Sequence, residues 1–151
     1  MELTNTKIVE IFTDGGCRGN PGIGGWGVLL RFGSSEKVLK GNSKHTTNNR
    51  MELTAVIKGL EALNKKSKVS VTTDSKYVID GIDKWIINWK KNNWKTSSKK
   101  EVKNVDLWKT LDTLCIKHEV NFFWIKGHSG HAENELVDDL ANQAMDEITK
   151  D

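Results

Sequence analysis

The chain has 151 residues, 36% of them hydrophobic and 28% charged, which is typical of one soluble globular domain. No apolar run approaches the roughly eighteen residues that a membrane span needs. The amino-terminal sequence also lacks the basic and apolar regions of a signal peptide. We therefore expect a single domain over residues 1–151, without a membrane partner.

Two cysteines, Cys17 and Cys115, are too few for a disulfide framework and too isolated for a zinc site. A reducing, cytoplasmic compartment is the simplest interpretation.

Positive charge is concentrated in one segment. Residues 84–109 contain eight lysines against Glu101 and Asp106, a local net charge of +6, whereas the whole chain carries +3. The remainder is slightly acidic. An acidic body with a basic segment indicates a polyanionic partner and a separate group of carboxylates.

The residue pattern predicts alternating groups of strands and helices. A β-branched and aromatic first strand breaks at Asp14-Gly15-Gly16, and the glycine-rich residues 19–25 are expected to form a loop. The basic residues 92–103 are expected to form a protruding loop or helix end. The predicted strands are 7–13, 26–32, 37–44, 69–73 and 120–125, and the predicted helices are 48–65, 75–91, 105–117 and about 133–148. This order predicts an α/β fold with a mixed sheet and helices on its faces.

Asp14 and Asp74 share one local setting, because each follows a strand ending in Thr and precedes a small residue. Crevices beyond the carboxyl ends of parallel strands are common ligand sites, so neighbouring strands would place both carboxylates in one site. The alternative is that each is an ordinary turn or helix-cap aspartate.

Two further carboxylates lie at the edges of apolar helix faces. Glu52 lies one turn before Val56, and Asp138 lies close to the azimuth of Met145, whereas Asp139 points to solvent. A carboxylate at a buried edge is costly unless it is paired or bound to metal. The alternative for Glu52 is a first-turn glutamate that the helix dipole favours.

Four carboxylates in one crevice would repel one another unless divalent cations lay among them. Oxygen-only ligation suits Mg²⁺, with Mn²⁺ as a substitute, rather than zinc. Two such ions about 4 Å apart can activate water and stabilise the leaving oxygen of a phosphodiester. We therefore predict metal-dependent phosphodiester hydrolysis, with Asp14, Glu52, Asp74 and Asp138 as ligands.

The loop at residues 126–131 contains two histidines, of which His128 is the candidate for proton transfer to the leaving 3′-oxygen. The alternative is an ordinary surface histidine in a polar loop.

Several motifs occur in one order along nearly the whole chain. They are Phe12-Thr-Asp-Gly-Gly-Cys-Arg-Gly-Asn-Pro-Gly22, Thr47-Asn-Asn-Arg-Met-Glu-Leu53, Thr73-Asp-Ser75, Trp85-Ile-Ile-Asn-Trp-Lys-Lys91, Trp124-Ile-Lys-Gly-His-Ser-Gly-His131 and Glu133-Asn-Glu-Leu-Val-Asp138. Each is modest by itself, but the ordered set is specific. The set resembles the bacterial ribonuclease HI family.

The resemblance implies an RNase H-like fold, a five-stranded mixed sheet with the first three strands antiparallel and helices on both faces. It also implies endonucleolytic cleavage of RNA in RNA–DNA hybrids, leaving a 5′-phosphate and a 3′-hydroxyl. The four carboxylates match the family's metal ligands, and His128 matches its loop histidine. The segment at about 84–103 resembles the basic handle that holds the DNA strand.

The resemblance also implies substrate contacts. Lys76 stands where relatives often have Gln, so a groove contact is expected to become a phosphate contact. Helix spacing leaves open whether the two tryptophans flank the DNA backbone or pack the handle on the core. Each asparagine has a turn or helix-cap alternative. The implied contacts are Asn20, Asn48 and Asn49 in the minor groove, Thr47 and Asn104 at a DNA phosphate, and Lys76, Trp85 and Trp89.

Three other interpretations remain to be compared. An integrase, transposase or junction resolvase would share the acidic cluster but not the handle and groove asparagines together. A non-catalytic hybrid-binding module would be expected to lack one of the carboxylates. A purely structural basic domain gives Glu52 and Asp138 no purpose.

No oligomer signal is present, so we expect a monomer that binds an RNA–DNA hybrid.

Overall fold

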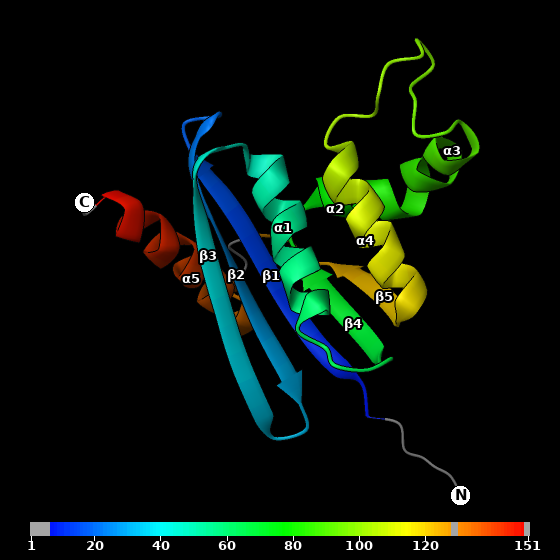
Figure 1. Cartoon of the computed structure of the whole chain (residues 1–151). Coiled ribbons are helices and arrows are strands. Elements are labelled where there is room, and N and C mark those ends of the chain that lie inside the picture. Colours follow the sequence, from blue (N-terminus) through cyan, green and yellow to red (C-terminus); the bar gives the residue numbers. More distant parts are fainter. Residues whose placement is uncertain (1–6, 128–129, 150–151) are drawn as a thin grey trace, which may run out of the picture.

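A computed structural model describes residues 7–127 and 130–149 of the chain (Figure 1). These residues form one five-stranded sheet and a set of helices that alternate with its later strands. The strands are β1 (Val9–Arg18), β2 (Gly22–Phe32), β3 (Ser35–Thr46), β4 (Lys68–Thr73) and β5 (Glu119–Trp124). The helices are α1 (Asn48–Glu61), α2 (Lys76–Asp80), the π-helical turn η1 (Gly81–Trp85), α3 (Ile86–Lys91), α4 (Val105–Lys117) and α5 (Ala132–Thr149).

The strands lie in the order β3-β2-β1-β4-β5. β2 is antiparallel to both β1 and β3, whereas β4 runs parallel to both β1 and β5. This mixed topology confirms the fold class predicted from the sequence. It also places the carboxyl ends of β1 and β4 at the same edge of the sheet.

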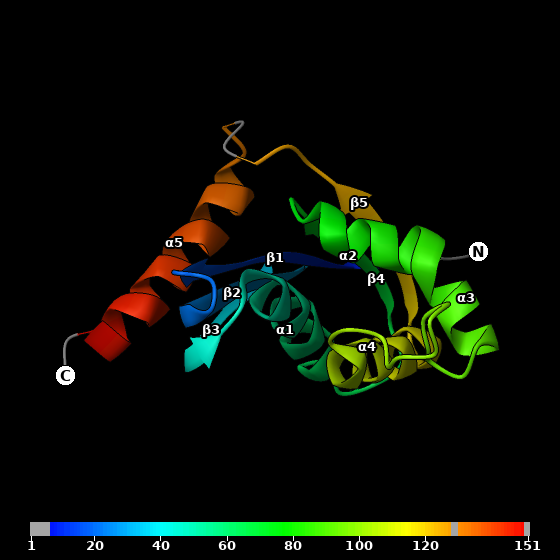
Figure 2. The ribbon, with the colours of Figure 1, turned by 90° about the horizontal axis from the view of Figure 1, so that it is seen from above.

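Helices cover both faces of the sheet. Figure 2 shows α5 on one side of the sheet and α1 with α4 on the other. The alternation of side chains along β1 explains this layering, because Ile11 joins the larger core and Phe12 joins a smaller core beneath α5. Val137 and Leu140 supply the helix side of that smaller core. α5 is therefore fixed against the sheet independently of the other helices.

The hairpin between β1 and β2 differs from the prediction. Strand β1 continues through Asp14-Gly15-Gly16 to Arg18, and β2 already begins at Gly22, so the loop predicted at 19–25 is only a short turn. Gly15 and Gly25 mark close packing rather than a loop. A Cβ atom at Gly15 would overlap the α1 backbone at Met51, and one at Gly25 would overlap α5 at the carbonyl of Ala141.

Two predicted helix boundaries also change. α1 ends at Glu61 instead of residue 65, because residues 64–66 are exposed and have no apolar side chain to bury. The predicted helix at 75–91 contains the π-helical turn η1. Gly81 begins this turn, and a Cβ atom there would overlap the ring of Trp108. The close approach of α4 therefore requires glycine at this position.

Residues 92–103 form a loop that extends away from the sheet (Figure 1). Within it, Lys95 and Glu101 form an isolated antiparallel bridge, and the Val102 amide donates to the Trp94 carbonyl at 3.1 Å. The prediction of a protruding loop is confirmed.

Among the described residues, none of the helices has both the length and the apolar composition needed to cross a bilayer.

Candidate metal centre

The parallel pairing of β1 and β4 ends at Thr13 and Thr73; Asp14 is the next residue of β1, and Asp74 directly follows β4. Glu52 joins them from α1, and the three side chains can each offer an oxygen within 4.8 Å of the others. The interpretation of Asp14 and Asp74 as separate turn residues does not explain this convergence. The sheet and α1 together create the cluster.

Close packing of α1 on β1 positions Glu52. The Gly15 amide donates a hydrogen bond of 2.9 Å to Glu52 Oε1. Because Gly15 has no side chain, the first turns of α1 can approach the strand closely enough for this contact. The same glycine that resembled a strand break in the sequence therefore holds one carboxylate beside the next.

Asp138 reaches the cluster from α5. It lines the same cavity as Asp14, Glu52 and Asp74, with a volume of about 410 Å³. Asp138 is half-buried, whereas Asp139 is exposed, as the helical pattern predicts.

The electrostatics of the cluster favour a bound cation. Burial first, and then the charges of Glu52 and Asp74 and the interaction with Asp138, together raise the pKa of Asp14 to about 9. Burial and the charge of Asp74 raise the pKa of Glu52 to about 8, although hydrogen bonds from Ser75 and Gly15 oppose the shift. Without a cation, protons stabilise the cluster at neutral pH.

The donor set fits a hard divalent cation. The three converging residues offer only carboxylate oxygens, and two of them, Asp14 and Glu52, are each 8% exposed. Mg²⁺ and Mn²⁺ prefer such oxygen ligands, whereas zinc sites usually include His or Cys. Asp138 lines the same cavity beside them.

His128 lies outside the described residues, and its predicted role stays a prediction. The segment that precedes it starts beside the cluster, because a Cβ atom at Gly127 would lie 2.7 Å from Asp74 Oδ2. Trp124 Nε1 also donates to the Asp74 carbonyl at 3.0 Å.

The predicted groove contacts, together with Thr47 of the predicted phosphate pocket, gather at the start of α1. Thr47 is the N-cap residue, and its hydroxyl accepts from the Arg50 amide at 3.3 Å. Asn20 Oδ1 accepts from the Asn48 amide at 3.0 Å, so the structure confirms a capping role for Asn20. Asn48 lines the carboxylate cavity, and Asn49 is half-buried in the next position. Their contact with substrate remains a prediction.

Asn104 belongs to a hydrogen-bond network that the sequence did not reveal. Its Nδ2 donates to the Tyr77 hydroxyl at 3.1 Å, and its Oδ1 accepts from Arg50 Nη1 at 3.2 Å. Arg50 also holds Asp106 through two hydrogen bonds of 3.0 and 2.8 Å. Helical periodicity placed Arg50 on the outer face of α1 but gave no sign of its partners in α4.

The two handle tryptophans pack against other aromatic rings. The Trp85 ring lies 5.7 Å from both Tyr77 and Trp89, and Trp89 lies 5.4 Å from Trp108. Both are half-buried, so packing of the handle base is part of their role. A contact of their exposed edges with DNA stays a prediction. Lys76 is exposed, with its Nζ 5.1 Å from the centre of the Trp124 ring.

The cavity also contains residues that sequence reasoning missed. Arg18 lines it, pairs with Asp146 at 2.7 Å and donates to the Asn142 carbonyl at 3.3 Å. Cys17 and Met145 lie in the same wall. These contacts were not evident from the sequence, because a predicted loop at 19–25 did not place Arg18 next to α5.

Together, the mixed sheet and the carboxylate cluster define an α/β protein with a candidate centre for divalent cations. The profile of the RNase H family matches residues 6–146. The chain belongs to the RNase H family.

Sequence relatives agree with this assignment. The chain is 67% identical over 141 residues to the ribonuclease H of Hydrogenovibrio crunogenus, covering 93% of this chain and 97% of that protein. It is 60% identical over 137 residues to the ribonuclease HI of Neisseria meningitidis serogroup B, covering 91% and 94% respectively.

Solved structures show the same fold. LC9-RNase H1, described as a type 1 RNase H with the type 2 active-site motif, is 32% identical with a TM-score of 0.85 over 97% of this chain and 75% of that one. LC11-RNase H1 in complex with an RNA/DNA hybrid is 24% identical with a TM-score of 0.70, over 93% of this chain and 99% of that one, and shows the similarity of fold.

Proposed function

We propose that this protein is an endoribonuclease that hydrolyses the RNA strand of RNA–DNA hybrids, with divalent cations held by Asp14, Glu52, Asp74 and Asp138. The convergence of Asp14, Glu52 and Asp74 within 4.8 Å is the observation that carries the proposal. The names of the relatives, ribonuclease H and HI, support the same activity.

The cluster supplies negative oxygens in a half-enclosed cavity. Bound there, Mg²⁺, or Mn²⁺ as a substitute, supplies charge neutralisation at the phosphate and activation of water for in-line displacement. The chain's own part is to keep the carboxylates at one place, through the Gly15 contact to Glu52 and the packing of α5 beside Asp14. The bond between phosphorus and the 3′-oxygen breaks, which leaves a 5′-phosphate and a 3′-hydroxyl.

The histidine-bearing loop at residues 126–131 completes the proposed chemistry. We assign His128 the transfer of a proton to the leaving 3′-oxygen, because an imidazole can exchange protons near neutral pH. This assignment rests on the sequence motif, since His128 lies outside the described residues.

The proposed hybrid path runs from the carboxylates to the handle. Asn20, Asn48 and Asn49 stand beside the cavity, and amides suit a wide, shallow minor groove that displays 2′-hydroxyls. Thr47 and Asn104 are proposed to hold a DNA phosphate, with Lys76, Trp85 and Trp89 further along. The exposed lysines of residues 84–103 would neutralise the DNA backbone.

We further propose that residues 1–151 form one domain that acts as a monomer in the cytoplasm. Cys17 and Cys115 are free thiols, which fits a reducing compartment.

A duplex panel tests the proposed function. Labelled RNA–DNA, RNA–RNA and DNA–DNA duplexes of one sequence are incubated with Mg²⁺ and, separately, with EDTA. We expect cleavage of the RNA strand in the hybrid alone, and only with Mg²⁺. Cleavage of all three duplexes would indicate another nuclease of the same fold, and tight hybrid binding without cleavage would indicate a binding module.

A further inference from the structure

The arginines of the chain, Arg18, Arg31 and Arg50, differ in how fully other side chains balance their charge. Arginine matches a phosphate well, because its planar guanidinium can donate parallel hydrogen bonds to two oxygens. An arginine whose donors are not used up within the protein is therefore a candidate for contact with a nucleic acid.

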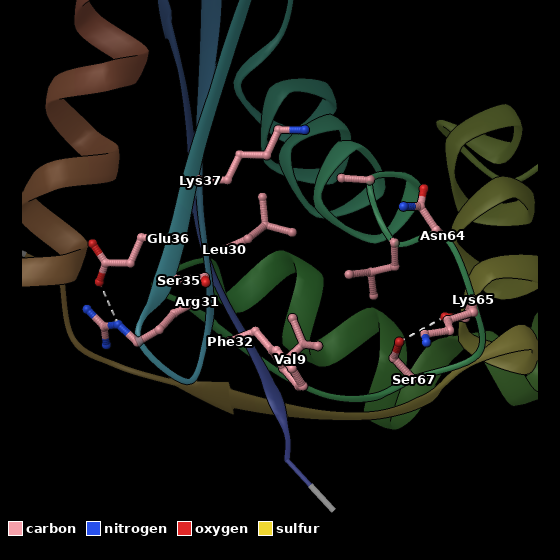
Figure 3. Close-up of a pocket in the computed structure, with 12 residues that line it drawn as sticks. Val9, Leu30, Arg31, Phe32, Ser35, Glu36, Lys37, Asn64, Lys65 and Ser67 are labelled. Atoms are coloured by element: carbon pink, nitrogen blue, oxygen red, sulfur yellow. Dashed lines mark hydrogen bonds and ion pairs between the residues drawn. The ribbon is translucent and has the colours of Figure 1, made fainter.

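Arg31 is fully engaged within the protein. It lines a cavity of about 330 Å³ between the β2–β3 hairpin and the segment that follows α1 (Figure 3). Its guanidinium pairs with Glu36 at 2.8 Å, with Glu133 at 3.2 Å and with Glu10 at 3.7 Å. Because three carboxylates more than balance one positive charge, Arg31 links the strands β1, β2 and β3 to α5 and has no charge left for a ligand.

Arg50 is engaged as well. It donates to the two carboxylate oxygens of Asp106 at 3.0 and 2.8 Å and to Asn104 Oδ1 at 3.2 Å. A bidentate pair occupies the same N–H groups that a phosphate would take. Arg50 therefore joins α1 to α4 and is not available to a substrate.

Arg18 differs from both. It is the last residue of β1, and its side chain is 41% exposed. Its single carboxylate partner among the described residues is Asp146, 2.7 Å from Nη1, and Asp146 is itself 53% exposed. Nη2 donates to the carbonyl and to the side-chain oxygen of Asn142, both at 3.3 Å. These contacts use the terminal nitrogens, so the N–H group of Nε has no partner in the part of the chain that the structure describes.

Arg18 also lies beside the proposed metal ligands. It lines the same cavity of about 410 Å³ that the four carboxylates line. Asn142 connects the two, because its Nδ2 donates to the Asp138 carbonyl at 3.0 Å while its Oδ1 accepts from Arg18. The cavity therefore has carboxylates in its interior and a guanidinium next to them on the α5 side.

We propose that Arg18 binds a phosphate of the RNA strand, the one next to the phosphate that is cleaved. This inference rests on the proposed function, in which the cleaved phosphate lies at the carboxylates. Asp146 and Asn142 hold the guanidinium in place before the substrate arrives, which reduces the conformational entropy that binding costs.

The position of Arg18 favours the RNA strand over the DNA strand. Figure 2 shows α5 and the handle helix α3 on opposite sides of α1. The handle is proposed to hold the DNA strand, which leaves the α5 side of the cavity to the RNA strand. Arg18 contacts α5 through Asn142 and Asp146, so it lies on that side.

A phosphate contact next to the cleaved bond predicts a particular kinetic effect. The contact is made in the bound substrate and in the transition state alike, because the neighbouring phosphate does not change during hydrolysis. Such uniform binding lowers KM and leaves kcat nearly unchanged. Loss of Arg18 should therefore appear in KM.

Steady-state kinetics in Mg²⁺ with site-specifically modified hybrids tests the proposal. In the parent hybrid, 2′-O-methyl groups confine cleavage to one bond of the RNA strand. In two further hybrids, a neutral methylphosphonate replaces the phosphate on the 5′ or the 3′ side of that bond. We expect Arg18→Gln to raise KM for the parent hybrid about tenfold near 0.1 M salt, with kcat within about twofold of wild type. One of the two methylphosphonates should raise KM about tenfold for wild type but less than about twofold for Arg18→Gln.

Two control variants separate a phosphate contact from a structural role. Asp146→Asn removes the ion pair between β1 and α5 but keeps the guanidinium, so it should respond to the methylphosphonate as wild type does. Lys58→Gln removes another exposed, ion-paired cation, which lies outside the cavity and 3.7 Å from Glu61, and should leave KM near the wild-type value. If Arg18 served only to fix α5, Arg18→Gln and Asp146→Asn would raise KM and lower the unfolding temperature alike.

Three results would overturn the proposal. The first is independence of the effects of Arg18→Gln and of both methylphosphonates, and the second is coupling of Arg18→Gln to a methylphosphonate in the DNA strand instead. In both cases wild type would still hydrolyse the parent hybrid, so the proposed function would stand. The third is a lack of hydrolysis by wild type, which would refute the proposed function and this inference together.

Discussion

At the scale of single residues, the cost of the carboxylate cluster is concentrated in Asp14 and Glu52. Both are 8% exposed, and burial together with neighbouring negative charge raises the pKa of each. A protein that needs only a stable core has no use for such groups. A bound divalent cation would offset the unfavourable burial of these carboxylates. Removing one of them should therefore lower the activity but raise the stability of the metal-free protein.

Asp14→Asn should lower hybrid hydrolysis by roughly a hundredfold or more, because loss of residues that only support metal ligands already costs about 10–100-fold. The metal-free variant should be more stable than wild type, because one of the mutually repelling buried carboxylates is gone. A gain of about 1 kcal/mol would raise the unfolding temperature by about 2–4 °C at this chain length. Rates with labelled hybrid and calorimetry in EDTA measure the two effects.

Asp139→Asn is the matched control. Asp139 is exposed next to the half-buried Asp138, so its replacement should leave both rate and unfolding temperature near wild type. If Asp14→Asn kept wild-type activity, Asp14 would not belong to the proposed metal centre.

His118 should make stability depend on pH. It is 3% exposed, its Nδ1 accepts from the Ser67 amide at 3.1 Å, and its buried Nε2 has no hydrogen-bond partner among the described residues. Burial, and then the charge of Lys117, lowers its pKa below the usual 6.5. A second ring proton would make Nδ1 a donor that faces the Ser67 N–H group.

The sign of the pH effect follows from this lowered pKa. Near pH 6.5 and below, His118 binds a proton more readily in the unfolded chain than in the folded one. The free energy of unfolding therefore falls as the pH falls. His118→Asn keeps an oxygen acceptor near Ser67 without a titrating ring. Urea unfolding between about pH 7.5 and 5.5 should therefore show a steeper loss for wild type than for His118→Asn, and parallel curves would contradict the assignment.

At the scale of elements, the handle is an extension anchored by aromatic packing. Its base is held where Trp85 and Trp89 meet Tyr77 and Trp108, and its tip is the loop 92–103. The lysines of that loop are exposed. The packing side and the charged side of this segment therefore have separate roles, and charge can be removed without disturbing the base.

The triple variant Lys95→Gln/Lys99→Gln/Lys100→Gln should bind hybrids of any sequence more weakly and with a flatter salt dependence. Each lost phosphate contact costs about tenfold near 0.1 M salt and changes the slope of log K against log salt by about 0.9. Anisotropy of a labelled hybrid over a salt series measures both quantities.

The charge-matched control is Lys44→Gln/Lys58→Gln/Lys117→Gln, which removes the same charge outside the handle. It should keep the wild-type slope. Equal slopes in wild type and in the handle variant would show that the handle does not touch the substrate.

At the scale of the whole molecule, the proposed metal centre joins parts that are distant in sequence. Asp14 comes from β1, Glu52 from α1, Asp74 follows β4, and Asp138 comes from α5 on the other face of the sheet. A cation that binds all of them links both helical layers to the sheet. Metal binding should therefore stabilise the entire fold.

Mg²⁺ should raise the unfolding temperature of wild type in a concentration-dependent manner, because a ligand at 100 times its Kd stabilises by about 2.7 kcal/mol. Calorimetry over a Mg²⁺ series, with EDTA as reference, measures the shift. Glu52→Gln should show little or no shift. An equal shift in both proteins would place the bound ion elsewhere.

The sequence alone predicted the order of the strands and helices and the three carboxylates, Asp14, Glu52 and Asp74, that the structure brings together. Periodicity separated the apolar stripe of α1 from Glu52 at its edge, and it separated Asp138 from Asp139, because helix geometry fixes which side chains share a face. The ordered motifs indicated the family that the comparisons show.

Only the tertiary structure decided what the glycines and the aromatic residues do. Glycine favours turns and close contacts alike, so Gly15 and Gly25 could be interpreted only when α1 and α5 were seen packed on the hairpin. Arg50 hydrogen-bonds to Asp106 of α4, and Phe32 and Leu63 line one cavity. Both arrangements join segments that are far apart along the chain. Local sequence patterns carry no record of such contacts, because the packing of elements, and not their propensity, brings those residues together.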